Sequence, residues 1–269
     1  MRAAGFAICL LCAALPWAAA AQAPASNPTP ARQQLSVGER ADIFLARRNY
    51  PAAILLLQQA IKEHHADAAI YNRMGIAYQQ LQQLGHARNY YKKAIKMDKT
   101  EGRYWNNLGT VYYMQRNFKN AAKQFQRAVK LDRTEATYFV NLGGAEFALK
   151  KFRRAIAAYR QALLIDPNSL FPATGTDSPV VSDVMGTDTP RFHYDLSRLF
   201  CSLGMVDNAL HEFRQAYEMH YRDIKKSLTD PGFAPLRLRP EYRVLMGLPP
   251  LPPHAAPIPH GGQGLLRAH

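Results

Sequence analysis

Residues 102–135 read GRYWNNLGTVYYMQRNFKNAAKQFQRAVKLDRTE, and this stretch decides the fold. Its spacing of aromatic, glycine and alanine residues returns 34 positions earlier and 34 positions later in the chain. Six positions repeat in this way: Tyr71, Trp105 and Phe139; Met74, Leu108 and Leu142; Gly75, Gly109 and Gly143; Ala87, Ala121 and Ala155; Tyr91, Phe125 and Tyr159; and Ala94, Ala128 and Ala162. A period of this length predicts units of two helices joined by a short turn, each stacked on the next.

The repeats divide the middle of the chain into five units. Three are clear, at 68–101, 102–135 and 136–169, and two degenerate ones lie at 34–67 and 190–223. Degenerate units are expected at the ends of an array, because terminal repeats face solvent or a cap. The repeated glycine lies inside the first helix of a unit, where it costs roughly 1 kcal/mol relative to alanine. We expect this glycine to allow a close approach to two alanines of the second helix.

The pattern resembles the tetratricopeptide repeat. Residues 102–135 carry seven of its consensus positions, namely Trp105, Leu108, Gly109, Tyr112, Ala121, Phe125 and Ala128, and residues 136–169 end on its Asp-Pro. The resemblance implies an all-α fold, a right-handed superhelical solenoid of antiparallel helix pairs. It also implies a non-enzymatic scaffold that binds a peptide or protein segment in a concave groove lined by the first helices.

The resemblance also assigns groove positions residue by residue. They are Asn72, Arg73, Arg103, Asn106, Asn107, Thr110, Tyr113, Asn141, Phe147, Arg191, Tyr194, Asp195 and Arg198. An asparagine amide donates and accepts, so Asn107 and Asn141, one period apart, suit a peptide backbone. The chain does not match the carboxylate clamp of chaperone adaptors, because Ile76 and Thr137 occupy places that should be polar or basic.

Two segments interrupt or follow the repeats. Residues 170–189 form an insertion too long for an ordinary turn, which makes it either structural or functional. Residues 224–247 contain the arrangement Asp230-Pro231-x-Phe233-x-x-Leu236, which resembles the closing segment of some exported bacterial tetratricopeptide proteins. We expect this segment to be a helical C-terminal cap over the end of the stack.

Both ends of the chain differ from the middle. Residues 1–23 read as a signal peptide with an apolar core, cut after Ala21 or Ala23, and the alternative is a retained anchor. Residues 24–33 are a Pro-rich linker, and residues 248–269 are a Pro-rich tail expected to be disordered. Removal of the signal peptide leaves Cys201 as the one thiol, and its apolar surroundings predict that it is buried. The expected location is therefore the periplasm or the exterior of the cell.

The chain has 269 residues and a net charge of +14. Residues 68–169 hold 18 Lys and Arg against six Asp and Glu. Much of this charge falls on the second helices, which the resemblance places on the convex side: Lys92, Lys93, Lys96, Lys119, Lys123, Arg127, Lys130, Lys150, Lys151, Arg153 and Arg154. The alternative function is therefore binding of an anionic envelope surface or an acidic partner through these basic convex helices. No nucleic-acid motif is present, so nucleic acid is not an expected partner.

The sequence contains no recognisable catalytic motif. The chain has no Gly-rich phosphate loop and no Gly-x-Ser-x-Gly elbow. His211-Glu212 starts like a zinc-protease motif, but Gln215 stands where the second histidine is required. We therefore predict no catalytic, metal or cofactor site.

Overall fold

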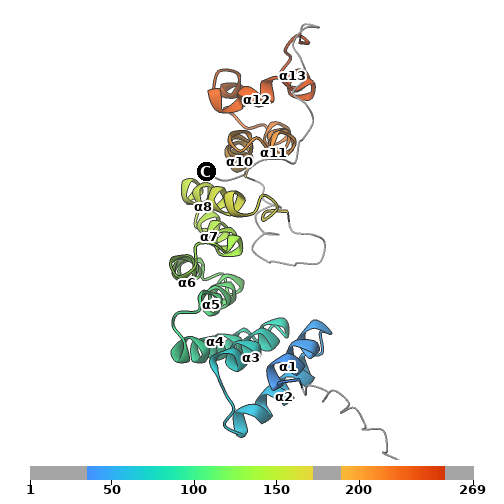
Figure 1. Cartoon of the computed structure of the whole chain (residues 1–269). Coiled ribbons are helices and arrows are strands. Elements are labelled where there is room, and N and C mark those ends of the chain that lie inside the picture. The colour runs from blue at the N-terminus through green and yellow to red at the C-terminus, as the bar shows by residue number, and fades with distance from the viewer. Residues whose placement is uncertain (1–34, 172–188, 252–269) are drawn as a thin grey trace, which may run out of the picture. The chain divides into compact units, whose positions relative to one another are not determined.

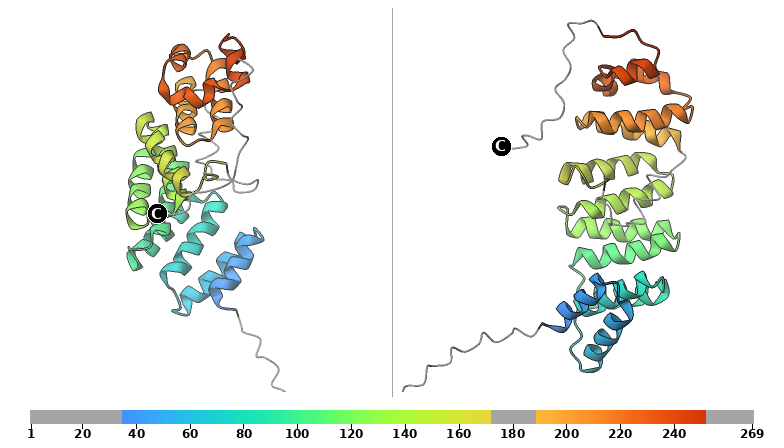
Figure 2. Two further views of the ribbon diagram at one scale, coloured as in Figure 1. Left: turned by 45° about the horizontal axis from the view of Figure 1, so that its top comes forward. Right: turned by 90° about the vertical axis from the view of Figure 1, so that its right-hand side faces the viewer.

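The computed structural model describes residues 35–171 and 189–251, and this part of the chain is all helical. Five helix pairs follow one another: α1 (Val37–Ala46) with α2 (Tyr50–Lys62), α3 (Ala68–Gln80) with α4 (Leu84–Met97), α5 (Gly102–Met114) with α6 (Phe118–Leu131), α7 (Ala136–Ala148) with α8 (Phe152–Ile165), and α10 (Pro190–Ser202) with α11 (Val206–Glu218). Each pair packs on the preceding one (Figures 1 and 2). This is the predicted all-α array of antiparallel helix pairs.

The turn inside each pair has the same backbone form. Its central residue takes a left-handed conformation with φ between 56° and 74°, at Arg48, Gln82, Arg116, Lys150 and Gly204. The next residue donates its N–H back into the first helix, as from Asn117 N to Tyr112 O at 2.9 Å. Four of the five turns adopt this conformation without glycine, although it is sterically unfavourable for a residue with a Cβ. The backbone hydrogen bonds that end the first helix hold the turn closed.

An aromatic ring of the second helix lies against the repeated glycine of the first. A Cβ added to Gly109 would lie 2.6 Å from Cε1 of Phe125, and a Cβ added to Gly75 or Gly143 would lie closer still to the ring of Tyr91 or Tyr159. The expectation that Gly109 faces alanines is therefore wrong, because the aromatic ring fills this space. The alanines at the repeated positions, such as Ala121, are fully buried elsewhere in the pair.

The first three junctions between pairs follow one rule, in which a link of four or five residues turns the next helix back on the last. Gly102, at the start of α5, lies close both to Tyr138 near the start of α7 and to the carbonyl of Ala128 near the end of α6. Helix α7 therefore runs antiparallel to α6 and parallel to α5. This is the arrangement of a simple stack of repeats.

The junction between α8 and α10 breaks this rule. Phe192, near the start of α10, packs its ring 4.4 Å from Phe147 and 6.4 Å from Phe152 at the start of α8. At the opposite end, Phe171 follows α8 and lies 5.6 Å from Phe200, close to the end of α10. Helices α8 and α10 therefore run in the same direction, and the fifth pair is reversed relative to the other four. The first helix of that pair does not continue the row formed by α5 and α7.

The segment after α11 folds onto the fifth pair. It consists of η1 (Ile224–Leu228), η2 (Pro231–Phe233), α12 (Ala234–Arg237) and α13 (Pro240–Leu245). Asp230 caps η2 by accepting from the N–H of Gly232 at 2.8 Å. Phe233 and Tyr242 are fully buried against Phe213 of α11, with ring centroids 5.9 and 4.8 Å away.

Several predicted segments lie outside the described residues. They are the signal peptide at 1–23, the linker at 24–33, most of the insertion at 170–189 and most of the tail at 248–269. Within the described ranges, no helix has the length and apolarity that crossing a membrane requires.

Candidate functional site

Asparagines join the first helices of neighbouring units. The amide of Asn107 on α5 donates to Oδ1 of Asn72 on α3 at 2.9 Å, and the amide of Asn141 on α7 donates to Oδ1 of Asn106 on α5 at 2.8 Å. At the start of the same row, Arg73 forms a two-pronged contact with Asp42 of α1, with both distances 2.8 Å. This amide ladder fixes the spacing between consecutive first helices.

Five of the predicted groove residues are buried. Asn72, Asn106 and Asn141 expose 4–8% of their surface, and Tyr113 and Tyr194 expose 4% and 6%. Tyr194 packs between Tyr221 and the cap residue Phe233, so it belongs to the core. These five side chains hold helices together, and in this conformation they cannot line a surface groove.

The other predicted groove residues reach the surface. Arg73, Asn107, Thr110, Phe147 and Asp195 are half-buried, whereas Arg103, Arg191 and Arg198 are exposed. Arg103 lies beside Glu101 at 3.4 Å and leaves 64% of its side chain accessible. Arg103, Asn107 and Thr110 all come from α5, and together with Arg73 they make up what we call the first-helix surface.

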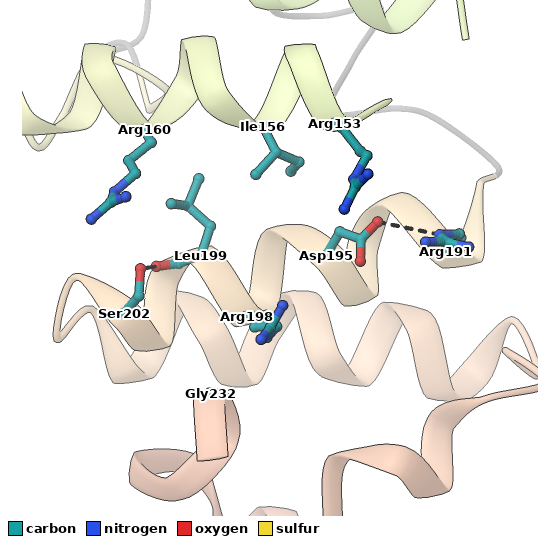
Figure 3. Close-up of a pocket in the computed structure, with 9 residues that line it drawn as sticks. All are labelled: Arg153, Ile156, Arg160, Arg191, Asp195, Arg198, Leu199, Ser202 and Gly232. Atoms are coloured by element: carbon teal, nitrogen blue, oxygen red, sulfur yellow. Dashed lines mark hydrogen bonds and ion pairs between the residues drawn. The ribbon is translucent and has the colours of Figure 1, made fainter. Parts of the chain in front are cut away.

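A cleft rich in arginine lies between α8 and α10 (Figure 3). It has a volume of about 470 Å³, and four arginines line it. Arg153 and Arg160 come from α8, while Arg191 and Arg198 come from α10. Ile156 from α8 and Leu199 from α10 point into the space between the two walls. A second cavity of the same volume shares Arg153, Arg191 and Asp195 with it and adds Lys150, Lys151, Phe152 and Arg154.

The structure thus regroups residues that the sequence assigned to different surfaces. Arg191 and Arg198 were predicted for the groove and Arg153 for the second-helix face, but all three line one cleft. The reversed direction of α10 is the reason, because it places the start of α10 beside the start of α8. No feature of the local sequence pattern signals this reversal.

The described residues neutralise the positive charge of the arginine cleft only in part. Arg191 pairs with Asp195 at 3.3 Å, and the negative charge of Asp195 raises the pKa of Arg191 above its ordinary value. Arg198 pairs with Asp230 at 3.0 Å across the space left by Gly232. Among the described residues, Arg153 and Arg160 have no acidic partner.

The basic residues predicted for the second helices are all exposed. We call them the second-helix basic face: Lys92, Lys93, Lys96, Lys119, Lys123, Arg127, Lys130, Arg153 and Arg154. Some of its charges have contacts of their own. Lys93 Nζ lies 5.0 Å from the ring centre of Tyr90, and Arg127 lies 5.6 Å from that of Trp105. Arg154 approaches the buried carboxylate of Glu146 at 3.9 Å. The face remains basic after these contacts are taken into account.

Sequence reasoning missed one buried polar pair. His193 of α10 lies 2.6 Å from the carboxylate of Glu212 on α11, and both side chains are about 5% exposed. The pair joins the two helices of the reversed unit and lines neither cavity. Across the described ranges, no cluster of side chains is suited to a metal ion. Cys201 is buried as predicted, and burial raises the pKa of its thiol to about 11.

Comparison with known proteins finds repeats of one family. The model of the tetratricopeptide repeat family matches residues 72–136 and 115–169. The crystal structure of MamA is 19% identical over 71% of this chain and 99% of its own, with a TM-score of 0.48. The Arabidopsis OM64 TPR domain is 22% identical over 43% of this chain and 90% of its own, with a TM-score of 0.38. The first TPR of Spaghetti (RPAP3) bound to HSP90 peptide SRMEEVD is 25% identical over 45% and 94%, with a TM-score of 0.38. A search of curated protein sequences finds no match.

Proposed function

We propose that this chain, whose residues 72–169 match the tetratricopeptide repeat, is a non-enzymatic scaffold that binds a segment of a partner protein in the cell envelope. One observation carries the proposal. The amide ladder holds consecutive first helices rigidly, and beside it Arg73, Arg103, Asn107 and Thr110 present polar groups at the surface. A rigid surface with positioned hydrogen-bonding groups loses little conformational entropy when a segment binds to it. The apolar leader at residues 1–23 supports an envelope location.

The polar groups of the first-helix surface suit a peptide backbone. Asn107 uses its amide N–H to hold Asn72, and its own carbonyl oxygen remains available as an acceptor. Arg103 supplies N–H donors four residues earlier on α5, which is one helical turn away. A bound segment would therefore meet a donor and an acceptor that are fixed on the same helix.

Site-specific photocrosslinking tests the proposal. A photoreactive residue in place of Arg103 should capture a partner when the protein is expressed in its host and the envelope fraction is analysed. The matched controls replace Lys119 and Lys123, which are equally exposed but lie on the second helix α6. Capture from position 103 and not from 119 or 123 supports the first-helix surface. Capture from the two controls alone would refute it.

The second-helix basic face favours a second candidate, an anionic envelope surface or an acidic partner. All nine of its Lys and Arg side chains are exposed on α4, α6 and α8. Binding to a charged surface weakens steeply as salt rises, because the Debye length falls from about 10 Å at 0.1 M to about 3 Å at 1 M. Co-sedimentation with phosphatidylglycerol vesicles over this salt range tests this candidate. Vesicle binding should weaken in a Lys119→Gln, Lys123→Gln variant if the face is responsible.

A further inference from the structure

We infer that the arginine cleft between α8 and α10 is a second binding site, separate from the first-helix surface, and that it takes an acidic peptide segment with two apolar residues between its carboxylates. The cleft is lined by second helix α8 and by the reversed helix α10, so it is not part of the row formed by α3, α5 and α7. The carboxylate clamp that the sequence lacks would lie on that row.

The charges of the cleft select an anion. Four arginines line the cavity, and Asp195 is the one carboxylate among those of its lining residues that the structure describes. Asp195 and Asp230 hold Arg191 and Arg198 in place, whereas Arg153 and Arg160 are unpaired within the described ranges. Guanidinium groups bind carboxylates through two parallel hydrogen bonds, which gives geometric selectivity as well as attraction.

The spacing of the arginines selects an extended ligand. Arg153 and Arg160 are seven residues apart on α8, and Arg191 and Arg198 are seven apart on α10. Seven residues correspond to about 10.5 Å along a helix. An extended chain rises about 3.3 Å per residue and its successive side chains point to opposite sides, so two acidic side chains three residues apart span nearly the same distance and would face opposite walls of the cleft. A single small anion would contact one end of the cleft only.

The centre of the cleft selects an apolar side chain. Ile156 points into it from α8 and Leu199 from α10, and both lie between Arg153 and Arg160 in the view of Figure 3. The cavity volume of about 470 Å³ accommodates a short segment of this kind. The predicted ligand pattern is therefore acidic–apolar–apolar–acidic.

Calorimetric titration of the full chain at low salt tests this site. The probe is the blocked peptide Ser-Glu-Val-Leu-Glu-Ser, and the matched probe has both Glu residues replaced by Gln. We expect the Glu peptide to bind at least tenfold more tightly than the Gln peptide. In the Arg153→Gln, Arg160→Gln variant this difference should disappear, because the two unpaired guanidinium groups are gone. The control Arg214→Gln removes one exposed arginine of α11 outside the cleft and should keep the difference.

Three results would overturn the inference. One is equal binding of the two peptides, and another is an unchanged preference in the double variant with a native circular dichroism spectrum. The third is arginine-dependent binding of inorganic phosphate that is as tight as that of the Glu peptide, which would make the cleft a site for small anions. None of these results affects the outcome of the photocrosslinking experiment at Arg103. The proposal for the arginine cleft and the proposal for the first-helix surface can therefore be refuted independently.

Discussion

Replacement of Gly109 by alanine tests how much stability depends on the close contact between this glycine and the ring of Phe125. The added Cβ would lie 2.6 and 2.7 Å from Cε1 and Cδ1 of Phe125, whereas carbon atoms normally approach to about 3.5–4.0 Å. The ring must therefore move by about 1 Å, and Phe125 is fully buried, so other core side chains must move with it. Overpacking of this kind costs about 1–3 kcal/mol, and the gain in helix propensity returns roughly 1 kcal/mol. We expect a net loss of stability, because the packing term is the larger.

Gly85 provides the matched control. It lies in the first turn of α4 with no atom within 4 Å of the position of an added Cβ, so Gly85→Ala should be neutral or stabilising by up to about 1 kcal/mol. Thermal unfolding followed by circular dichroism separates the two, since about 1 kcal/mol shifts the Tm of a domain of this size by roughly 2–4 °C. A second control introduces Gly109→Ala into a Phe125→Leu variant, which lacks the ring. There Gly109→Ala should lower the Tm by less than it does in the protein that keeps Phe125. If Gly109→Ala raised the Tm as Gly85→Ala does, the inferred contact between glycine and ring would be refuted.

Three further results are expected. Cys201 should react with Ellman's reagent at pH 8 far more slowly in the folded protein than in urea, because a thiol pKa near 11 leaves roughly one molecule in a thousand as thiolate; equal rates would show that the thiol is accessible. His193→Phe should lower the free energy of unfolding by about 3–5 kcal/mol, because it leaves the carboxylate of Glu212 buried without its partner, and His193→Phe with Glu212→Leu should recover part of the loss in urea titrations; losses that simply add would contradict this coupling. Burial raises the pKa of Tyr138 to about 12 and that of Tyr159 well above its usual value, so the folded state favours neutral phenols. This stabilisation is complete below the unfolded pKa of about 10 and is lost as the pH rises above it, so phenolate absorbance should rise together with loss of helical signal; smooth ionisation near pH 10 with the helices intact would argue against it.

The helix pairs could be predicted because their information is local. The positions that repeat every 34 residues are those that pack against each other within a pair. The fifth pair retains this pattern at Leu196, Ala209 and Phe213. The glycine position of that pair holds Ser197, whose hydroxyl donates to the carbonyl of Ala209 at 2.7 Å. The same pattern could not predict the direction of α10. Packing within a pair is unchanged when the whole pair is turned round, and the insertion removes the short connection that fixes direction elsewhere.

The site was harder to predict than the fold because burial depends on neighbours. Asn106 and Asn107 are adjacent in sequence and identical in chemistry, yet Asn106 is buried in the amide ladder and Asn107 reaches the surface. Their roles differ because successive side chains of a helix point about 100° apart. The arginine cleft was not predictable at all, since its two walls are joined only through the reversed junction.

The reversed junction also limits how this protein can have grown. Tandem duplication of a 34-residue unit within residues 68–169 inserts one more helix pair that runs in the same direction as its neighbours, and both of its faces find the partners they require. A copy of the fifth unit placed after residue 223 would instead separate α10 and α11 from the segment that buries Phe233 and Tyr242. The array can thus lengthen on the side of α1 to α8, whereas the end formed by α10, α11 and the closing segment must be inherited as one block. Homologues of different length are expected to vary in the number of their central units and to keep this block whole.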